Sequence, residues 1–471
     1  MMPEQNVTII GAGLAGSLLS IYLARRGFSV TVFEARGDMR KERVEAGRSI
    51  NLALSDRGIA ALREVGMDAF MLSEAVPMLG RMIHSATGEQ KLLPYSGREG
   101  EYINSVSRSG LNIALMNEAE KYPNVAFIFG ERCTDFDTAT GEATFASGRT
   151  FRGDTVIATD GAGSPVRQAM QRQIRGFEFS SRFLDHGYKE LHIPPGPDSS
   201  FLLEKNALHI WPRHRFMMIA LPNHDGSFTC TLFLAHKSEP LAPLRPEEEW
   251  PQAGVEGEEG GLFEWSFDEL TDEASVLDFF TREFPDAVPM MPTLVEDFFA
   301  NPTGQLGTIK CWPWNAGGKA LLLGDSAHAI VPFYGQGMNC AFEDVRVLDT
   351  LIGNAGTPDW GAIFTEYGQL RKVNTDAIAD LAEENFYEMR DRVADPIFQR
   401  KRELETRLEQ TFPDYFSKYS MVTFREDMPY SEAHRRGNAQ DELLMNICSS
   451  VDDVSELDLN EVAEHLRQLE M

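Results

Sequence analysis

The sequence predicts an α/β fold in which a parallel-sheet domain is interleaved with an antiparallel-sheet domain and followed by a helical C-terminal region. Three observations support this prediction. Residues 7–33 read as a buried strand, a glycine-rich turn, a helix and a second strand. Residues 187–233 are dense in alternating apolar side chains, which favours antiparallel strands. After Gly337 the apolar spacing is helical to the end of the chain.

Length and composition limit the class of protein. With 471 residues, of which 42% are hydrophobic, the chain is long enough for two or three structural units. It contains no apolar run of bilayer length and no signal-peptide pattern. Its five cysteines never form a C-x-x-C pair, which indicates a reducing compartment and opposes a structural zinc site. We therefore expect a cytoplasmic protein without a membrane segment or a bound metal.

The chain is strongly acidic, with a formal net charge of −28. Such a charge opposes binding to nucleic acid or to an anionic membrane, so that anionic ligands require locally placed cations. The segment 241–275 holds eleven acidic residues and one basic residue, Arg245, together with several prolines and glycines. We interpret it as an exposed acidic insertion, and a solvated loop is a simpler reading than an interaction segment.

The glycine-rich turn lies at residues 11–16, directly after the first strand. Gly11 permits a tight turn, Gly13 lets the backbone approach a pyrophosphate, and Gly16 allows close packing of helix and strand. Glu34 directly follows the second strand, 18 residues after Gly16, where an acid should bind a ribose hydroxyl. A glycine-rich turn without a ligand is the alternative, but it does not explain this order of elements. The sequence thus predicts an adenine dinucleotide on the helix N-terminus.

Further elements follow in order along the chain. The segment 56–65 reads as a helix, and 77–102 reads as short strands with turns. Ser107 is a candidate N-cap for a helix that runs to Lys121. Arg108 beside it is a candidate ligand for a cofactor phosphate or ribityl chain, although an isolated arginine is more often a surface charge.

Two later buried strands end in acidic residues. The strand at 155–159 is followed by Asp160-Gly161, and the strand at 320–323 is followed by Gly324-Asp325. Ligands bind at the carboxyl ends of parallel strands, so both acids are candidates to bind cofactor hydroxyls. For each acid taken alone, a helix N-cap is an equally open interpretation.

Between these segments, residues 187–233 predict an antiparallel sheet with one buried face, a suitable wall for a substrate cavity. The later helices are expected at 338–352, 360–385 and 394–409.

Together, the glycine turn with Glu34, Asp160-Gly161 and Gly324-Asp325 resemble the three-part signature of the FAD-dependent aromatic hydroxylases, the class A flavoprotein monooxygenases. Longer blocks resemble the kynurenine 3-monooxygenase family within that class, and the similarity covers about residues 6–430. These blocks are residues 47–55, 206–212, 331–339 and 419–424. They are more specific than the glycine fingerprint.

The resemblance implies FAD as cofactor and NADPH as cosubstrate in a chain of three parts. The FAD-binding domain would comprise residues 1–76, 103–176 and 300–355. The substrate-binding β-sheet domain would comprise 77–102 and 177–299, including the insertion 241–275, and the C-terminal helical region would comprise 356–471.

The resemblance also implies the residues around FAD. Glu34 would hold the adenosine ribose, and Asp325 would hold the ribityl or pyrophosphate part. Gly337 would line the cofactor directly before the helix expected at 338–352. That helix would aim its N-terminus at the flavin, where it stabilises negative charge on the reduced ring. The remaining expected cofactor-binding residues are Gly11, Gly13, Ala15, Gly16, Ala35, Arg36, Ala53, Arg108, Cys133, Asp160, Met338 and Asn339.

For the substrate, the resemblance implies that Arg81 and Tyr95 clamp the carboxylate of kynurenine, with Asn385 and Tyr419 contributing from the helical region. An arginine offers a bidentate fork to a carboxylate. Phe233 and Phe333 are expected apolar walls, although each is equally compatible with a plain core position. Without the resemblance, Arg81 reads as a surface charge and Tyr95 as a core aromatic.

The implied reaction is hydroxylation of L-kynurenine at ring position 3 with NADPH and O₂. Because the flavin carries the chemistry, we expect no catalytic side chain, and we interpret His328 as structural. Alternatives are a flavoprotein hydroxylase of another aromatic acid, or a non-catalytic binding protein of the same fold. Eukaryotic members of the family have a C-terminal membrane anchor, whereas the polar segment 451–471 favours a soluble, bacterial type, either monomer or homodimer.

Overall fold

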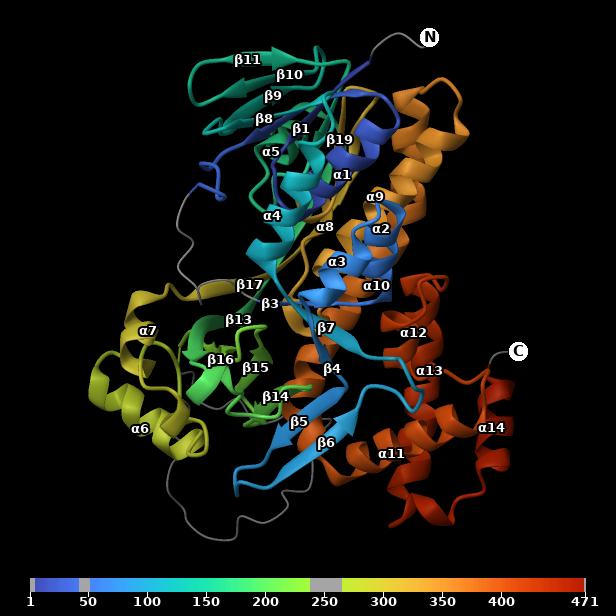
Figure 1. The fold of residues 1–471 in the computed structure, drawn as a ribbon. Coiled ribbons are helices and arrows are strands. Elements are labelled where there is room, and N and C mark those ends of the chain that lie inside the picture. The colour runs from blue at the N-terminus through green and yellow to red at the C-terminus, as the bar shows by residue number, and fades with distance from the viewer. Residues whose placement is uncertain (1–4, 42–50, 238–264, 470–471) are drawn as a thin grey trace.

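The computed structural model describes residues 5–41, 51–237 and 265–469, and it is built around two large β-sheets (Figure 1). The first sheet has six strands in the order β18–β19–β12–β1–β2–β8. Its strands are β1 (Asn6–Ile10), β2 (Ser29–Glu34), β8 (Val125–Phe129), β12 (Thr155–Ala158), β18 (Asn315–Ala316) and β19 (Ala320–Leu322). The α/β fold predicted from the sequence is confirmed.

The first sheet forms because its strands are apolar on both faces. β1 pairs in parallel with β2 and with β12, and Val7, Ile9 and Val32 are completely buried. Helix α1 (Leu14–Arg25) provides the crossover between β1 and β2 and packs against α4 (Arg108–Ala119) and α9 (Gly337–Asn354). This arrangement brings the carboxyl ends of β1, β2, β12 and β19 to one edge, the position at which such sheets bind ligands.

The second sheet has seven strands in the order β17–β13–β16–β15–β14–β5–β6. The strands are β5 (Gly80–His84), β6 (Gln90–Pro94), β13 (Glu178–Ile193), β14 (Ala207–Pro212), β15 (Met217–Pro222), β16 (Phe228–Ala235) and β17 (Gly304–Trp312). All neighbours are antiparallel except β14 and β5, which are parallel. β17 belongs to this sheet, although its residues fall within the segment 300–355 that the sequence assigns to the FAD-binding domain.

The expectation that this sheet has one buried face is wrong. All six residues of β14 are buried, as are seven of the eight residues of β16. One face packs against α6 (Glu273–Glu283) and α7 (Leu294–Ala300), and the other faces α10 (Trp360–Asp391), as Figure 1 shows. Two buried faces remove the polar alternation on which a sequence-based prediction depends.

Two small sheets and several short helices complete the first part of the chain. One sheet, β3–β7–β4, comprises β3 (Asn51–Leu54), β4 (Val76–Met78) and β7 (Ile103–Ser107), and the other comprises β9 (Cys133–Asp137), β10 (Glu142–Phe145) and β11 (Thr150–Arg152). The helices are α2 (Asp56–Glu64), α3 (Asp68–Ser73), α5 (Pro165–Gln173) and α8 (Asp325–His328). In Figure 1, β3, β4 and β7 lie between the two large sheets.

The C-terminal region is helical, as predicted. After α10 follow α11 (Pro396–Thr411), α12 (Lys418–Thr423), α13 (Tyr430–Ser449) and α14 (Leu459–Gln468). Helix α11 begins two residues after the expected start at 394, because the Asp395 side chain caps it and Pro396 occupies its first position. Among the described residues, no helix combines the length and the apolar character that crossing a bilayer requires.

Part of the predicted acidic insertion, residues 241–264, lies outside the described residues, as do residues 47–50 of the first family block. In the remainder, 265–275, the acidic side chains are exposed as predicted, whereas the large apolar side chains pack on the protein. Leu270 is buried, Trp265 and Phe267 pack on the same core, and Asp272 and Ser275 form a capping box at the start of α6.

A buried chain of polar groups joins the second sheet to Asp286, in the loop that follows α6. His209 Nε2 lies 2.8 Å from the Glu204 carbonyl, and His209 Nδ1 lies 2.8 Å from His84 Nε2. His84 Nδ1 in turn lies 2.7 Å from Asp286 Oδ2. A carbonyl only accepts, so His209 carries its proton on Nε2 and accepts from His84 at Nδ1.

The protonation states of His209 and Asp286, on either side of His84, follow from their pKa values. Burial lowers the pKa of His209 to about 4, so this ring is neutral at pH 7. Burial tends to raise the pKa of Asp286, but hydrogen bonds from His84 and Trp211 outweigh it and the pKa is lowered. His84 therefore donates one hydrogen bond to His209 Nδ1 and one to the Asp286 carboxylate.

Asp286→Asn should lower the free energy of unfolding by about 2 kcal/mol at pH 7, because His84 loses a charged acceptor. The pKa of Asp286 is lower in the folded state, so its stabilisation is complete above about pH 4 and is lost as the pH falls below that value. Urea unfolding between pH 7 and pH 3 should show the difference between the variant and the parent protein shrinking with acid. The exposed pair Asp278–Arg282 offers a control, Asp278→Asn, which should change stability by less than about 0.5 kcal/mol. A difference that is independent of pH would contradict the assignment.

Candidate active site

In the glycine turn between β1 and α1, neighbouring protein atoms leave no room for a side chain at two of the three glycines. Gly11 has φ +106°, and a Cβ there would lie 2.5 Å from the Thr159 carbonyl oxygen. A Cβ on Gly16 would lie 2.0 Å from the Gly11 oxygen. At Gly13, in contrast, a Cβ would meet no heavy atom within 4 Å. The protein itself does not require a glycine at position 13, and the open space before it fits a ligand that approaches the backbone.

The same space lies in front of the α1 N-terminus. Gly13 is the N-cap, and no side chain caps the helix. The first N–H groups of a helix have no partner within it, so they attract an anion. These observations fit the pyrophosphate of a dinucleotide, with Ala15 in the first turn of the helix.

Glu34 lies beside this loop and is ionised. Its Oε2 accepts from the Ala12 N–H at 2.9 Å, and its Oε1 accepts from the N–H and the Nε of Arg36 at 3.0 and 2.8 Å. Burial opposes ionisation, but these bonds lower the pKa of Glu34. Ala35 is half-buried and Arg36 is exposed. The structure thus shows Glu34 supporting the glycine turn, and its predicted contact with a ribose remains a prediction.

Asp160 follows β12 at the same edge of the sheet, and both of its carboxylate oxygens are buried and make no well-formed hydrogen bond within the described residues, although the Ser164 side chain and the Val166 N–H lie near them. Burial raises the pKa of Asp160 to about 6. The N-cap of α5 is Ser164, which accepts from the Arg167 N–H, so Asp160 does not cap that helix. A buried carboxylate with acceptor capacity left over fits a polar ligand group. Cys133 is close enough for the Asp160 charge to contribute, after burial, to raising the pKa of its thiol to about 12.

Asp325 begins α8 and is exposed, whereas the residues after it, Ser326 to His328, are buried. The N-cap of this short helix is Gly324, so the alternative reading of Asp325 as an N-cap does not hold. Arg108 is also exposed, at the start of α4, and Ser107 caps that helix by accepting from the Gly110 N–H as predicted.

The loop after α8 leads to the N-terminus of α9. The Cys340 N–H donates to the Gln336 carbonyl, which leaves the N–H groups of Gly337, Met338 and Asn339 as the first turn of the helix. The Asn339 side chain is fully buried and binds the backbone of β3, donating to the Ala53 carbonyl at 2.8 Å. Only the backbone of Asn339 is therefore available to a ligand.

A second set of predicted residues gathers between the second sheet and α10. Arg81 on β5 is only 7% exposed, and its Nη1 lies 3.0 Å from Glu388 Oε1. Its Nη2 lies 3.5 Å from Asn385 Oδ1, and its Nε is buried without a hydrogen-bond acceptor. The arginine is thus an interior cation with unused donor capacity, and the reading of Arg81 as a surface charge is wrong.

Aromatic rings surround this cation. Tyr95 and Tyr419 stack with centroids 4.8 Å apart, and Tyr334 stacks on Tyr419 at 5.5 Å. The Arg81 guanidinium lies 5.1 Å from the Tyr419 ring centroid. The buried Tyr95 hydroxyl makes no well-formed hydrogen bond, although Tyr419 and Arg81 lie near it. A ligand carboxylate would satisfy both Arg81 Nε and this hydroxyl.

An apolar wall continues from the tyrosines. Phe233 and Phe333 are buried with ring centroids 4.8 Å apart, and Phe333 lies 4.5 Å from Phe386. Asn385 Nδ2 donates to the Phe333 carbonyl at 2.6 Å. The loop 330–336 therefore lies between the predicted substrate-binding residues and the N-terminus of α9.

Two adjoining pockets lie here. The smaller is lined by Arg81, Tyr95 and Tyr419, and the larger, of about 380 Å³, is lined by Asn385 and by Asn438 and Asp441 of α13. Tyr334, Glu388 and Lys418 line both.

Comparisons with known proteins agree with this geometry. Residues 4–238 and 306–357 match the family model described as an FAD binding domain. A kynurenine 3-monooxygenase of Myxococcus xanthus is 46% identical over 470 residues, covering 98% of this chain and 95% of that protein. A kynurenine 3-monooxygenase of Dictyostelium discoideum is 43% identical, covering 97% and 96%. The chain belongs to the kynurenine 3-monooxygenase family.

Solved structures confirm the fold of this kynurenine 3-monooxygenase family member. The tetrameric form of 2-methyl-3-hydroxypyridine-5-carboxylic acid oxygenase has a TM-score of 0.64 at 18% identity, covering 84% of this chain and 96% of that one. Klebsiella pneumoniae HpxO, complexed with FAD and uric acid, has a TM-score of 0.64 at 20% identity, covering 86% and 94%.

Sequence reasoning missed three residues that line both pockets. Glu388 is the counter-ion of Arg81, and Lys418 and Tyr334 lie beside it. The predicted helix ends at residue 385, whereas α10 continues to Asp391 and carries Glu388 one turn after Asn385, where a buried arginine finds the anion that it requires. Tyr334 and Lys418 follow from no sequence pattern that we recognise.

Gly13→Ala should separate ligand binding from folding. The added methyl meets nothing in the protein, so the apoprotein should keep its melting temperature within about 2 °C, while FAD affinity should fall at least about tenfold. Thermal melts and fluorescence titration of the apoprotein with FAD test both points. Gly361→Ala, in α10 with contacts no closer than 3.4 Å, is a control that should leave affinity unchanged. Full FAD affinity in Gly13→Ala would show that the open space is not the cofactor site.

Proposed function

We propose that this chain is an FAD-dependent monooxygenase that hydroxylates L-kynurenine at ring position 3 with NADPH and O₂, giving 3-hydroxykynurenine. The observation that carries the proposal is membership of the kynurenine 3-monooxygenase family over nearly the whole chain. The pocket around Arg81 supports it, because an amino-acid substrate needs an interior site for its carboxylate.

The residues at the edge of the first sheet fit FAD. The N-terminus of α1 would hold the pyrophosphate, with Asp325 and the backbone of Met338 and Asn339 nearer to the flavin. The buried Asp160 carboxylate is a further polar group for it. When bound, FAD supplies the redox chemistry that links NADPH oxidation to the insertion of one oxygen atom into the ring. The α9 N-terminus would favour negative charge on that cofactor.

The second pocket fits the charged end of kynurenine. Arg81 and the Tyr95 hydroxyl would bind the carboxylate, with Asn385 beside them. Burial opposes ionisation of Glu388, but Arg81, Lys401 and Lys418 lower its pKa, so it is a carboxylate at pH 7. We propose that this carboxylate binds the substrate's α-ammonium group, because the two groups carry opposite charges and Glu388 lines both pockets.

The remaining tasks of the protein are orientation and exclusion of water. Phe233 and Phe333 would hold the aromatic ring on the apolar wall that continues toward the α9 N-terminus. The aryl amine of kynurenine already donates electrons into the ring, so no protein base is needed to activate it. Fixing the ring near the cofactor and keeping water out account for the contribution of these side chains.

The test is NADPH oxidation by the purified holoenzyme, with and without L-kynurenine, and identification of the product by mass. Strong stimulation with a product heavier by one oxygen atom supports the proposal. Stimulation without that product makes kynurenine an effector only, and no stimulation points to another aromatic acid. Bound FAD that NADPH reduces would exclude the alternative of a non-catalytic binding protein.

Arg81→Lys should raise the KM for kynurenine about 10- to 100-fold, because a lysine keeps the charge opposite Glu388 but loses the bidentate fork. FAD content should not change, since Arg81 lies in the second sheet. Steady-state kinetics and the visible spectrum of the purified protein provide the two measurements. Arg81→Ala tests the site less directly, because it also leaves Glu388 buried without the cation that pairs with it. A KM equal to that of the parent protein would remove Arg81 from the site.

Glu388→Gln should reduce the preference for kynurenine over its analogue without the α-amino group, 4-(2-aminophenyl)-4-oxobutanoate, by at least about tenfold in kcat/KM. The amide cannot form an ion pair with an ammonium group, and the analogue has none to lose. A matched control is Glu383→Gln on the same helix, whose carboxylate pairs with Arg182 at 3.0 Å and lines neither pocket. An unchanged preference in Glu388→Gln would show that the ammonium group binds elsewhere.

A further inference from the structure

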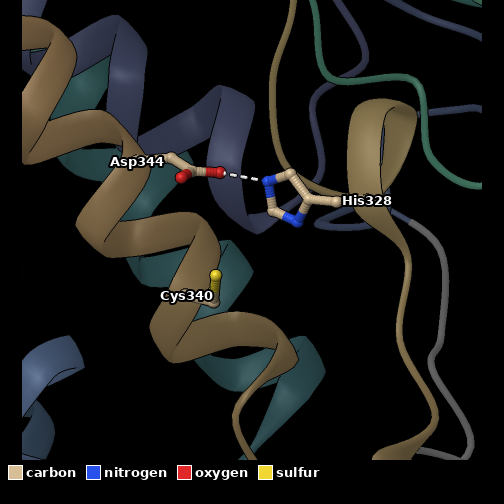
Figure 2. A group of neighbouring side chains, drawn as sticks. All are labelled: His328, Cys340 and Asp344. Carbon is tan, nitrogen blue, oxygen red and sulfur yellow. Dashed lines mark hydrogen bonds and ion pairs between the residues drawn. The ribbon is translucent and has the colours of Figure 1, made fainter. Parts of the chain in front are cut away.

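A buried cluster lies behind the proposed flavin site, at the junction of α8 and α9 (Figure 2). It contains His328 at the end of α8 and Cys340 and Asp344 on α9, whose potential ligand atoms lie within 4.8 Å of one another. Such a group is a candidate metal site. However, Arg371 of α10 places its Nε 2.6 Å from Asp344 Oδ1 and its Nη2 3.3 Å from Cys340 Sγ. The guanidinium already supplies the positive charge, so the cluster is not suited to a metal ion.

The centre of the cluster is the Asp344 carboxylate, which is completely buried. Its Oδ2 accepts from His328 Nε2 at 2.6 Å and from the Gly324 N–H at 3.2 Å. Burial opposes its ionisation, but His328 and Arg371 outweigh this effect and lower the pKa of Asp344. The Asp344 carboxylate on α9 thus binds both ends of the short helix α8: the Gly324 N–H before its first residue, and the side chain of His328, its last residue.

The Gly324 turn has little room to move. Its φ of +65° is a conformation that residues with a side chain rarely adopt, and a Cβ would lie 3.3 Å from the Ala341 Cβ and 3.7 Å from the Ala15 Cβ. Ala341 belongs to α9 and Ala15 to α1. The turn therefore lies between α1 and α9, whose N-termini point to the proposed cofactor site. The Asp344 side chain binds the turn to α9 through the Gly324 N–H.

We propose that Asp344 is a positioning residue for FAD. With His328 and Arg371 it sets the distance between Asp325 and the α9 N-terminus, so that both contact one cofactor. This inference rests on the proposed cofactor roles of Asp325 and of the α9 N-terminus. Asp344 acts through the Gly324 N–H and His328 and does not itself touch the cofactor.

The charges around the cluster are balanced, and two ion pairs and a hydrogen bond connect it to the C-terminal region. Arg371 Nη1 lies 2.7 Å from Glu343 Oε2, and Glu343 Oε1 lies 2.9 Å from Arg57 Nη1. Two carboxylates thus face two guanidinium groups, and Arg57 Nε donates to the Val422 carbonyl of α12 at 3.0 Å. Loss of the Asp344 charge leaves excess positive charge behind the flavin, which should make bound FAD easier to reduce.

The test compares Asp344→Asn with Asp441→Asn. Asp441 is also a buried carboxylate with two cations, Lys401 at 2.5 Å and Lys418, but it lies in the C-terminal region. We expect Asp344→Asn to weaken FAD binding at least tenfold and to shift the midpoint potential of bound FAD to a more positive value. Asp441→Asn should keep FAD affinity within twofold of the parent protein. Unchanged affinity and potential in Asp344→Asn would overturn the proposal, as would a stoichiometric metal ion in the purified protein.

A second pair of variants applies if Asp344→Asn does not fold. His328→Ala removes the donor to Asp344, whereas His328→Gln places an amide N–H near the position of Nε2. A fivefold or greater loss of FAD affinity in the alanine variant, largely restored in the glutamine variant, supports the proposal, and equal affinity in all three proteins overturns it. Asp325→Ala distinguishes the proposed cofactor role of Asp325 from the proposed positioning role of Asp344. Normal FAD affinity there refutes the cofactor role of Asp325, whereas impaired Asp325→Ala with normal Asp344→Asn refutes only the positioning role.

Discussion

The fold of the candidate site depends on the side-chain amide of Asn339. Its Oδ1 accepts from the Ser55 N–H at 3.0 Å, and its Nδ2 donates to the carbonyls of Ala53 and Gly335, both at 2.8 Å. These bonds join the first turn of α9, the end of β3 and the loop that carries the apolar wall of the second pocket. A buried amide with such partners is costly to replace, because each of the three backbone groups would lose a hydrogen bond. Three segments far apart in the chain are thus held as one surface.

The interior electrostatics contrast with the acidic exterior. The chain carries a net charge of −28, yet Arg81, Lys401 and Arg371 are all buried. Each is balanced by a carboxylate, namely Glu388, Asp441 and Asp344. Interior ion pairs are poor sources of stability, but they fix the direction of the groups that they join. This role suits a protein whose anionic ligands are repelled by the overall field and must be received at local positive charges.

The two halves of the candidate site were predictable to different degrees. The glycine turn and the acids at strand ends follow local rules, since each depends on a strand, a turn and a helix that are adjacent in sequence. Glu388 shows the opposite case, because its pairing with Arg81 joins β5 to α10 across 307 residues of chain. The second sheet was predicted with one buried face, since nothing local indicates that α6, α7 and α10 cover both of its faces.

By itself, the sequence determined the α/β class, the dinucleotide turn with its three glycines, and the family to which the chain belongs. These features depend on residue order and short-range geometry, which any chain with the same pattern must satisfy. Only the tertiary structure decided that Gly13 faces open space, that Arg81 is an interior cation, and that Asp344 binds the turn before Asp325. Each of these depends on which distant segments meet in the folded protein, and no local pattern carries that information.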